Sequence, residues 1–175
     1  MKKKIVFVAL LVMCLFMTGC GGSKDLDKDY TVDDAKDLIA TMYKNVGEDN
    51  LPAVETNEID IKDLELLTYY TGLKTNDNID YVITSDSMIG SQAYSVVLVK
   101  AADSSKVDSL KQEIFDNINP SKWICVTAEK LYVNNYGNLI MVIMADKDWA
   151  DPLYKEFTNI AKDNLGTKLE KENEI

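Results

Sequence analysis

The sequence contains no histidine and no arginine, so all 19 of its basic residues are lysines. Without histidine, the Ser-His-Asp and Cys-His arrangements of many hydrolases are excluded. The common zinc sites that use imidazole ligands are excluded as well. Without arginine, no side chain can hold a phosphate or carboxylate through the paired hydrogen bonds of a guanidinium group. We therefore expect no enzyme activity, no cofactor and no metal site.

Cysteine is also scarce, because the chain has only Cys14, Cys20 and Cys125. If the N-terminal segment is removed and Cys20 is lipidated, Cys125 has no partner within the chain. We therefore expect a fold without a disulfide. The neighbours of Cys125 in "WICV" are apolar, and this setting predicts a buried, unreactive thiol.

The N-terminal apolar run is too short to cross a membrane. Ile5–Met17 has 13 residues, whereas a spanning helix needs about 20. Lysines at positions 2–4 precede the run, and the small residues Thr18 and Gly19 follow it. This order of a positive segment, an apolar segment and a small-residue cleavage site is typical of a secretory signal peptide.

Cys20 comes directly after this cleavage site. The stretch "MTGC" resembles a bacterial lipobox, with Met17 where leucine is commonest. The resemblance implies that Cys20 is thioether-linked to a diacylglycerol and becomes the mature N-terminus. The alternative is an ordinary signal peptide or a single hydrophobic anchor, with Cys20 incidental. We expect a lipoprotein signal peptide over residues 1–19, then a lipidated cysteine and flexible tether over residues 20–30.

The mature chain would be strongly acidic. Removal of residues 1–19 leaves 16 lysines against 29 aspartates and glutamates, a net charge of −13. Such a chain is repelled by nucleic acid and by an anionic membrane surface. The predicted contact with the membrane is therefore through the lipid on Cys20.

Hydrophobic periodicity predicts a single α+β domain over residues 31–164, with its core at about 55–163. Thr31 and Asp34 form a helix-start signature, and the apolar spacing continues to Val46. A polar connector (48–60) and a short helix (63–70) follow. The expected core is a four-stranded antiparallel sheet in ββαββα order, with helices packed on it. The predicted elements are strands at 79–83 and 93–101, a helix near 105–118, strands at 124–133 and 139–144, and a helix from 146. The tail, residues 165–175, is charged and expected to be frayed.

Several phrases resemble a known family. They are the lipobox, "LLTYYTGL", "MIGSQAYSVVLVK", "KWICV", "LYV" and a Trp-led final helix. Together they resemble small lipid-anchored lipoproteins of Gram-positive anaerobes that share a domain of unknown function. The resemblance covers roughly residues 55–163. It implies a secreted, lipid-anchored domain and supplies no catalytic residues.

Three functions are compatible with these patterns. The first is a non-enzymatic binding or accessory module, anchored in the cell membrane on its extracytoplasmic face, that contacts an envelope protein or polymer. The second is an envelope enzyme that uses paired carboxylates on a polysaccharide. The third is a single-domain lipoprotein that binds a small solute. We favour the first, because nearly all of the acidic residues fall in predicted caps, turns and spacers.

Two stretches predict the contact surface of such a module. "YYTGL" (69–73) and "MIGSQAY" (88–94) combine aromatic or apolar side chains with a glycine in a loop, where binding residues are common. We expect Tyr69, Tyr70, Met88 and Gln92 to form one exposed patch. The alternative is that Gly72 only stops a helix, Gly90 only forms a turn, and these side chains cover the edge of the sheet.

Overall fold

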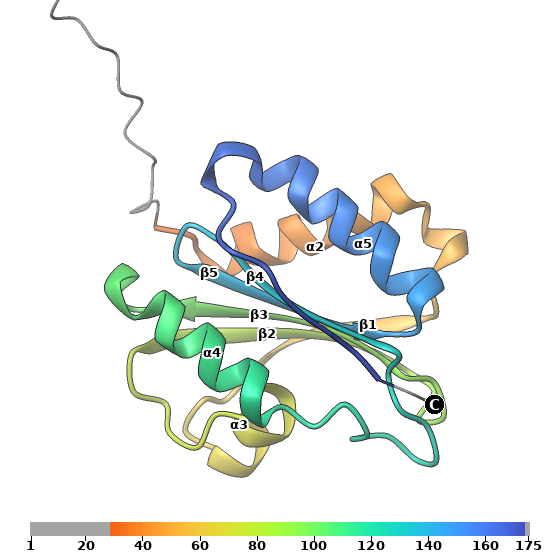
Figure 1. The fold of residues 1–175 in the computed structure, drawn as a ribbon, viewed down its shortest axis with the longest axis horizontal. Coiled ribbons are helices and arrows are strands. Elements are labelled where there is room, and N and C mark those ends of the chain that lie inside the picture. Colours follow the sequence, from red (N-terminus) through yellow and green to blue (C-terminus); the bar gives the residue numbers. More distant parts are fainter. Residues whose placement is uncertain (1–28, 174–175) are drawn as a thin grey trace, which may run out of the picture.

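The structure is a computed structural model that describes residues 29–173. It is an α+β fold in which helices cover both faces of one six-stranded antiparallel sheet (Figure 1). The strand order is β1-β2-β3-β5-β4-β6. The strands are β1 (Val54–Ile59), β2 (Ile79–Ser87), β3 (Tyr94–Ala101), β4 (Lys130–Tyr136), β5 (Leu139–Ala145) and β6 (Leu169–Glu172). The α-helices are α2 (Val32–Val46), α3 (Leu64–Thr71), α4 (Val107–Asn117) and α5 (Lys147–Ala161).

The four-stranded sheet expected from the sequence is wrong, because a further strand forms at each edge. β1 lies within the predicted connector and pairs with β2, from Val54 opposite Ser87 to Ile59 opposite Val82. β6 lies within the predicted frayed tail and pairs with β4. An edge strand has one paired neighbour and tolerates polar and charged side chains, so neither strand shows a strong apolar signal. The order of helices and strands is therefore αβαββαββαβ rather than ββαββα.

The strand predicted over residues 124–133 is shorter than expected. β4 begins only at Lys130, and residues 118–129 form a connecting segment without helix or strand. Cys125 in this segment has φ 60°, a left-handed conformation that interrupts an extended strand. The segment crosses from the end of α4 to the start of β4.

The two faces of the sheet have separate cores. Helices α2 and α5 lie on one face, and α3 and α4 lie on the other (Figure 1). Along β3, Val96 and Leu98 belong to the core beneath α2 and α5, while Val97 and Val99 belong to the core beneath α3 and α4. Every residue of β5 is buried, as the unbroken apolar run "LIMVIM" predicts for a strand covered on both faces. The N-terminal helix therefore shares its face of the sheet with the last helix.

Local signals set the helix ends. At the start of α2, the Asp34 amide donates to Thr31 Oγ1 at 3.2 Å, and the Thr31 amide donates to Asp34 Oδ2 at 2.9 Å. This confirms the predicted capping box. At the start of α3, Asp63 Oδ1 accepts hydrogen bonds from two backbone amides, and Gly72 ends the helix with φ 77°. No helix among residues 29–173 is long and apolar enough to span a bilayer.

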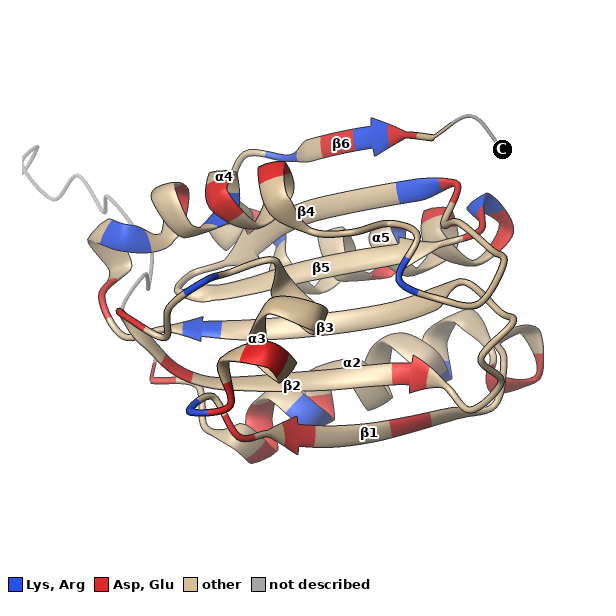
Figure 2. Cartoon of the chain, turned by 90° about the horizontal axis from the view of Figure 1, so that it is seen from below, with Lys and Arg blue, Asp and Glu red and all other residues tan. Residues whose placement is uncertain are grey.

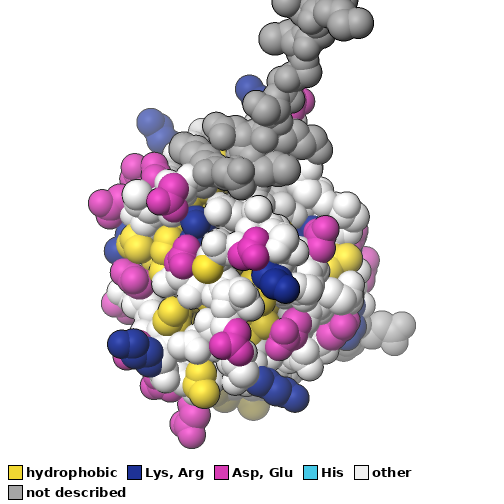
Figure 3. All heavy atoms as spheres, turned by 90° about the vertical axis from the view of Figure 1, so that its left-hand side faces the viewer, with side chains coloured by type: hydrophobic (Ala, Val, Ile, Leu, Met, Phe, Trp, Pro, Cys, Tyr) yellow, Lys and Arg dark blue, Asp and Glu magenta, His cyan; other side chains and the backbone are white. Residues whose placement is uncertain are grey.

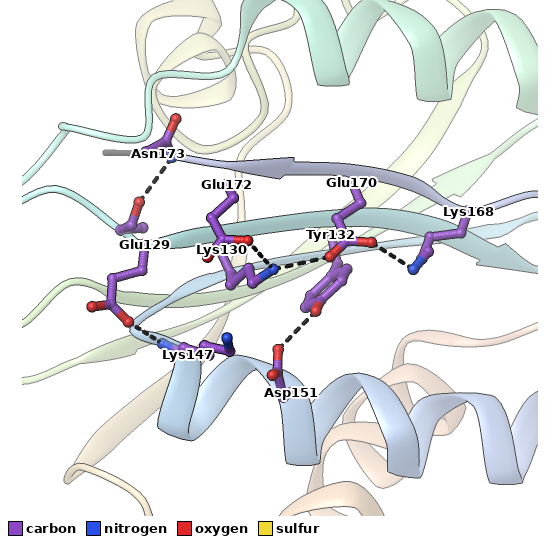
Figure 4. A network of polar contacts seen from close by, with 10 residues as sticks. Glu129, Lys130, Tyr132, Lys147, Asp151, Lys168, Glu170, Glu172 and Asn173 are labelled. Atoms are coloured by element: carbon purple, nitrogen blue, oxygen red, sulfur yellow. Dashed lines mark hydrogen bonds and ion pairs between the residues drawn. The ribbon is translucent and has the colours of Figure 1, made fainter. Parts of the chain in front are cut away.

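Charged residues line both outer strands of the sheet, as Figure 2 shows for β1 and β6. At the β6 edge, Lys130 Nζ lies 3.1 Å from Glu170 Oε1 and 2.8 Å from Glu172 Oε2, and Lys168 forms a further ion pair with Glu170 (Figure 4). These pairs join β6 to β4. Charges on an edge strand also disfavour pairing with a second chain.

Candidate functional site

The predicted contact residues lie toward one end of the sheet. Tyr69 and Tyr70 are in the last turn of α3, and Met88 and Gln92 are in the hairpin between β2 and β3. Tyr69 and Met88 are exposed, whereas Tyr70 and Gln92 are partly buried. Cys20, the predicted lipidation site, lies outside the described residues.

Exposed apolar side chains gather around this hairpin. Met88 is 68% exposed, Ile89 50%, and Ile124 of the connecting segment 72%. The Ile124 amide donates to the Gly90 carbonyl at 3.2 Å, so the connecting segment lies against the hairpin. Tyr69, 45% exposed, reaches the same segment through its hydroxyl, 3.5 Å from the Lys122 carbonyl oxygen. We call Tyr69, Met88, Ile89 and Ile124 the hairpin-end patch.

The opposite end of the sheet has a different surface. Figure 3 faces the end at which β3 finishes. On the part of this face that the grey atoms leave visible, apolar side chains form small separate areas among acidic and lysine side chains. The hairpin-end patch thus differs in character from the surface at the far end.

Next to the patch, a lysine is buried among aromatic rings. The Lys122 side chain is 1% exposed, and its Nζ lies 3.1 Å from Asp86 Oδ1 and 3.0 Å from Ser95 Oγ. Nζ also lies 4.4 Å from the ring centroid of Tyr70, 4.9 Å from that of Tyr69 and 5.2 Å from that of Trp123. The rings of Tyr69 and Tyr70 meet edge to face at 5.0 Å. We call this cluster the Lys122 cage.

Strand register positions the polar floor of the cage. Asp86 of β2 and Ser95 of β3 are directly opposite one another. They lie on the face of the sheet that α3 and α4 cover, in line with Thr84 on β2 and Val97 on β3. Ser95 is fully buried. A carboxylate and a hydroxyl at these positions require a polar partner, and Lys122 supplies it.

Burial and charge oppose each other in this pair. Burial lowers the pKa of the Lys122 ammonium, and the Asp86 carboxylate partly restores it. Burial raises the pKa of Asp86, whereas Lys122 and Ser95 lower it in part. Within the described part of the chain, Asp86 Oδ2 has no hydrogen-bond partner. The Asp86 carboxylate thus keeps an unused acceptor beside a bound ammonium group.

Sequence reasoning identified the two tyrosines but missed Lys122, Asp86 and Ser95. Asp86 and Ser95 stand in "SDSMIGSQAYS", which is typical of a polar turn. Only the strand register shows that both side chains enter the protein. The burial of Lys122 could not be predicted from neighbouring residues, because its partners Asp86 and Ser95 lie 36 and 27 positions away in the sequence.

Two surface hollows bear on the alternative functions. One, of about 410 Å³, adjoins the hairpin and is lined partly by Gln92, Cys125 and Asp146. A second, of about 510 Å³, lies between the ends of α2 and α5 and includes Asp148 and Glu156. Asp148 is exposed, and Glu156 accepts hydrogen bonds from Asn45 and Asn159. A glycosidase acid needs a shielded carboxyl group, whereas Asp148 is exposed and Glu156 is only partly buried.

Cys125 is exposed, so the predicted burial of its thiol is wrong, and its predicted low reactivity loses the reason given for it. Its apolar neighbours in "WICV" do not surround it: Trp123 and Val126 pack against the core beneath α3 and α4, whereas Ile124 is exposed. Nowhere in residues 29–173 do three or more cysteine, aspartate or glutamate side chains gather as a metal site would require.

The comparisons with known proteins identify no family for this chain: no family model matches it, and neither the curated proteins nor the solved structures provide a match.

Proposed function

We propose that this protein is a non-enzymatic binding module, held on the extracytoplasmic face of the cell membrane by a lipid on Cys20, that contacts another envelope protein through the hairpin-end patch. The observation that carries the proposal is the group of exposed apolar side chains at one end of the sheet, Met88, Ile89 and Ile124 above all. Tyrosine and methionine are also enriched at protein interfaces.

The position of the patch favours a partner over the bilayer as its target. The described chain begins at Asp29, whose carboxylate lies 3.4 Å from Lys100 Nζ near the end of β3. The hairpin lies at the other end of β3. Eight residues of antiparallel strand (94–101) span about 25 Å at about 3.4 Å per residue. A lipid anchor before Asp29 would thus attach the domain at the end away from the patch.

Charge around the patch indicates the chemistry of the partner. Asp146 lines the neighbouring hollow, and the carboxylates of Glu129 and Asp148 are close enough to act on it. With a mature net charge of −13, the domain is expected to attract a basic surface. We infer a partner whose apolar contact area is bordered by lysine or arginine.

The proposal is tested by site-specific photo-crosslinking in cells. A photoreactive residue replaces Ser91, which is exposed in the hairpin. We expect a discrete adduct with a second envelope protein in the otherwise unchanged chain. The substitutions Met88→Ser and Ile124→Ser together should remove the adduct without lowering the amount of folded protein, because both side chains are exposed.

The matched control is Leu64→Ser, since Leu64 is 46% exposed on the first turn of α3. This variant should keep the adduct. An adduct with a second copy of the chain or with lipid alone would contradict a separate protein partner. A complete lack of adducts, or equal loss in the control, would contradict the patch as the contact surface.

A further inference from the structure

We propose that the Lys122 cage is a binding site for organic ammonium groups, that Lys122 is its internal occupant, and that an external primary or quaternary ammonium takes its place when Lys122 withdraws. The proposal goes beyond the function proposed above. Its test requires neither the lipid anchor nor the envelope partner.

The cage has a fixed part and a part that can leave. Asp86 and Ser95 are on two paired strands, and Tyr69 and Tyr70 are on α3. Lys122 is on the connecting segment 118–129, which has no helix or strand. Withdrawal of Lys122 therefore breaks no regular secondary structure. What remains is a carboxylate, a hydroxyl and two aromatic rings.

These remaining groups are the ones that recognise an ammonium ion. Aromatic faces within about 6 Å attract a cation, and the attraction increases when water is excluded. The carboxylate supplies the opposite charge, and Ser95 Oγ accepts a hydrogen bond. Asp86 Oδ2, buried and without a partner in the described residues, can accept a further hydrogen bond from a primary ammonium. A quaternary ammonium would instead use the ring faces.

The cage differs from the other sites where lysines are buried. Lys111 is 3% exposed, and its Nζ contacts Asp108 Oδ1 and Asn135 Oδ1. Lys122 has three ring centroids within 5.2 Å in addition to its carboxylate. Burying such an ion pair is often no more stabilising than an apolar replacement, so stability alone gives little reason for this arrangement. An ammonium-binding function accounts for both the rings and the carboxylate.

The primary test measures how accessible the Lys122 amine is in the unaltered full chain, purified in a non-ionic detergent. A short pulse of acetic anhydride labels exposed lysine amines, and mass spectrometry reports each site. The probe is tetramethylammonium chloride, which cannot react with the anhydride, compared with sodium chloride at equal concentration. A ligand that binds only the open state multiplies its population by one plus the ratio of ligand concentration to dissociation constant. Labelling of Lys122 should therefore rise about tenfold when this ratio reaches about ten.

Lys111 is the matched internal control, since it is equally buried but has no part in the cage. Its labelling should be the same in both salts. Equal labelling of Lys122 in the two salts would overturn the proposal. A parallel rise at Lys111 would also overturn it, because the probe would then be loosening the whole fold.

A second test removes the internal occupant. The substitution Lys122→Ala deletes a fragment that corresponds to n-propylammonium. We expect n-propylammonium chloride to raise the unfolding temperature of this variant in a saturable way, whereas sodium chloride should not. The response should disappear when Asp86→Asn is added. A folded Lys122→Ala protein without a saturable response refutes the site, and if that variant does not fold, the labelling experiment decides.

Discussion

At the scale of single residues, Gly72 ends α3 with a positive φ and in close contact with backbone atoms, a combination that requires glycine. Its φ is 77°, and a Cβ there would lie 2.5 Å from the Ile118 amide nitrogen and 2.6 Å from the Asn117 carbonyl carbon. Gly90, in the hairpin, has no positive φ. A Cβ at Gly90 would lie 3.9 Å from Ile124 Cδ1, an ordinary contact distance. The two glycines are thus not equivalent, although each lies in one of the two stretches predicted to form the contact surface.

We predict that Gly72→Ala lowers the free energy of unfolding by about 2 kcal/mol or more, because it combines backbone strain with a clash against backbone atoms. Gly90→Ala is the matched control and should change it by less than about 0.5 kcal/mol. Urea unfolding of both variants measures the difference. Equal effects at the two positions would contradict the assignment of strain to Gly72.

Cys125 is a second residue for which the structure corrects the prediction from sequence. Because its thiol is exposed, we predict rapid and complete reaction with a thiol reagent under native conditions. The measurement is mass spectrometry of the peptide that contains Cys125, with Cys125→Ser as the control. Protection that persists until the protein unfolds would show that the connecting segment covers the thiol.

At the scale of secondary-structure elements, β6 is held by charge as well as by backbone pairing. Hydrogen bonds from Lys168 and Lys130 lower the pKa of Glu170 to about 2. Lys130 also lowers the pKa of Glu172. A carboxylate with a lowered pKa in the folded state stabilises that state above its unfolded pKa, here 4.5. This contribution is lost as the pH falls through the folded pKa.

We therefore predict that the amides of β6 lose hydrogen-exchange protection as the pH falls from about 4.5 to about 2, after correction for intrinsic exchange rates. The central strands β3 and β5 should stay protected over the same range, because they are buried on both faces. Lys130→Met should weaken β6 protection at neutral pH and reduce its dependence on pH. An unchanged pH profile in Lys130→Met would show that the ion pairs do not hold the strand.

At the scale of the whole molecule, the proposed location depends on Cys20. One acyl chain binds a membrane weakly and two bind firmly, since each buried CH₂ contributes about 0.8 kcal/mol. The mature chain is too acidic to be attracted to an anionic bilayer. The lipid is therefore expected to provide the attachment.

We predict that Cys20→Ser moves the protein from the membrane fraction to the soluble fraction if cleavage still occurs, and otherwise leaves an unprocessed precursor without acyl label. The measurements are fractionation and metabolic labelling with a fatty acid. Cys14→Ser, within the apolar run, is the control and should behave as the unaltered protein. An absence of acyl label on the unaltered protein would refute the anchor.

Structural elements that depend on neighbouring residues could be predicted from the sequence alone. The cap of α2 joins Thr31 to Asp34, three positions apart, and the apolar run of β5 reads directly as a strand buried on both faces. Such signals are local, because a helix cap or a buried strand is specified within a few residues. The helices and the inner strands β2, β3 and β5 were therefore predictable, whereas the start of β4 was not.

The edges of the sheet and the Lys122 cage depend instead on contacts between segments that are distant in sequence. β1 and β6 are polar, and they become strands because β2 and β4 offer them unpaired backbone groups. In the cage, Lys122 meets Asp86 across 36 positions and Ser95 across 27. The register of β2 against β3 turns both polar side chains inward. The residues most informative about binding thus come together only when distant segments pack.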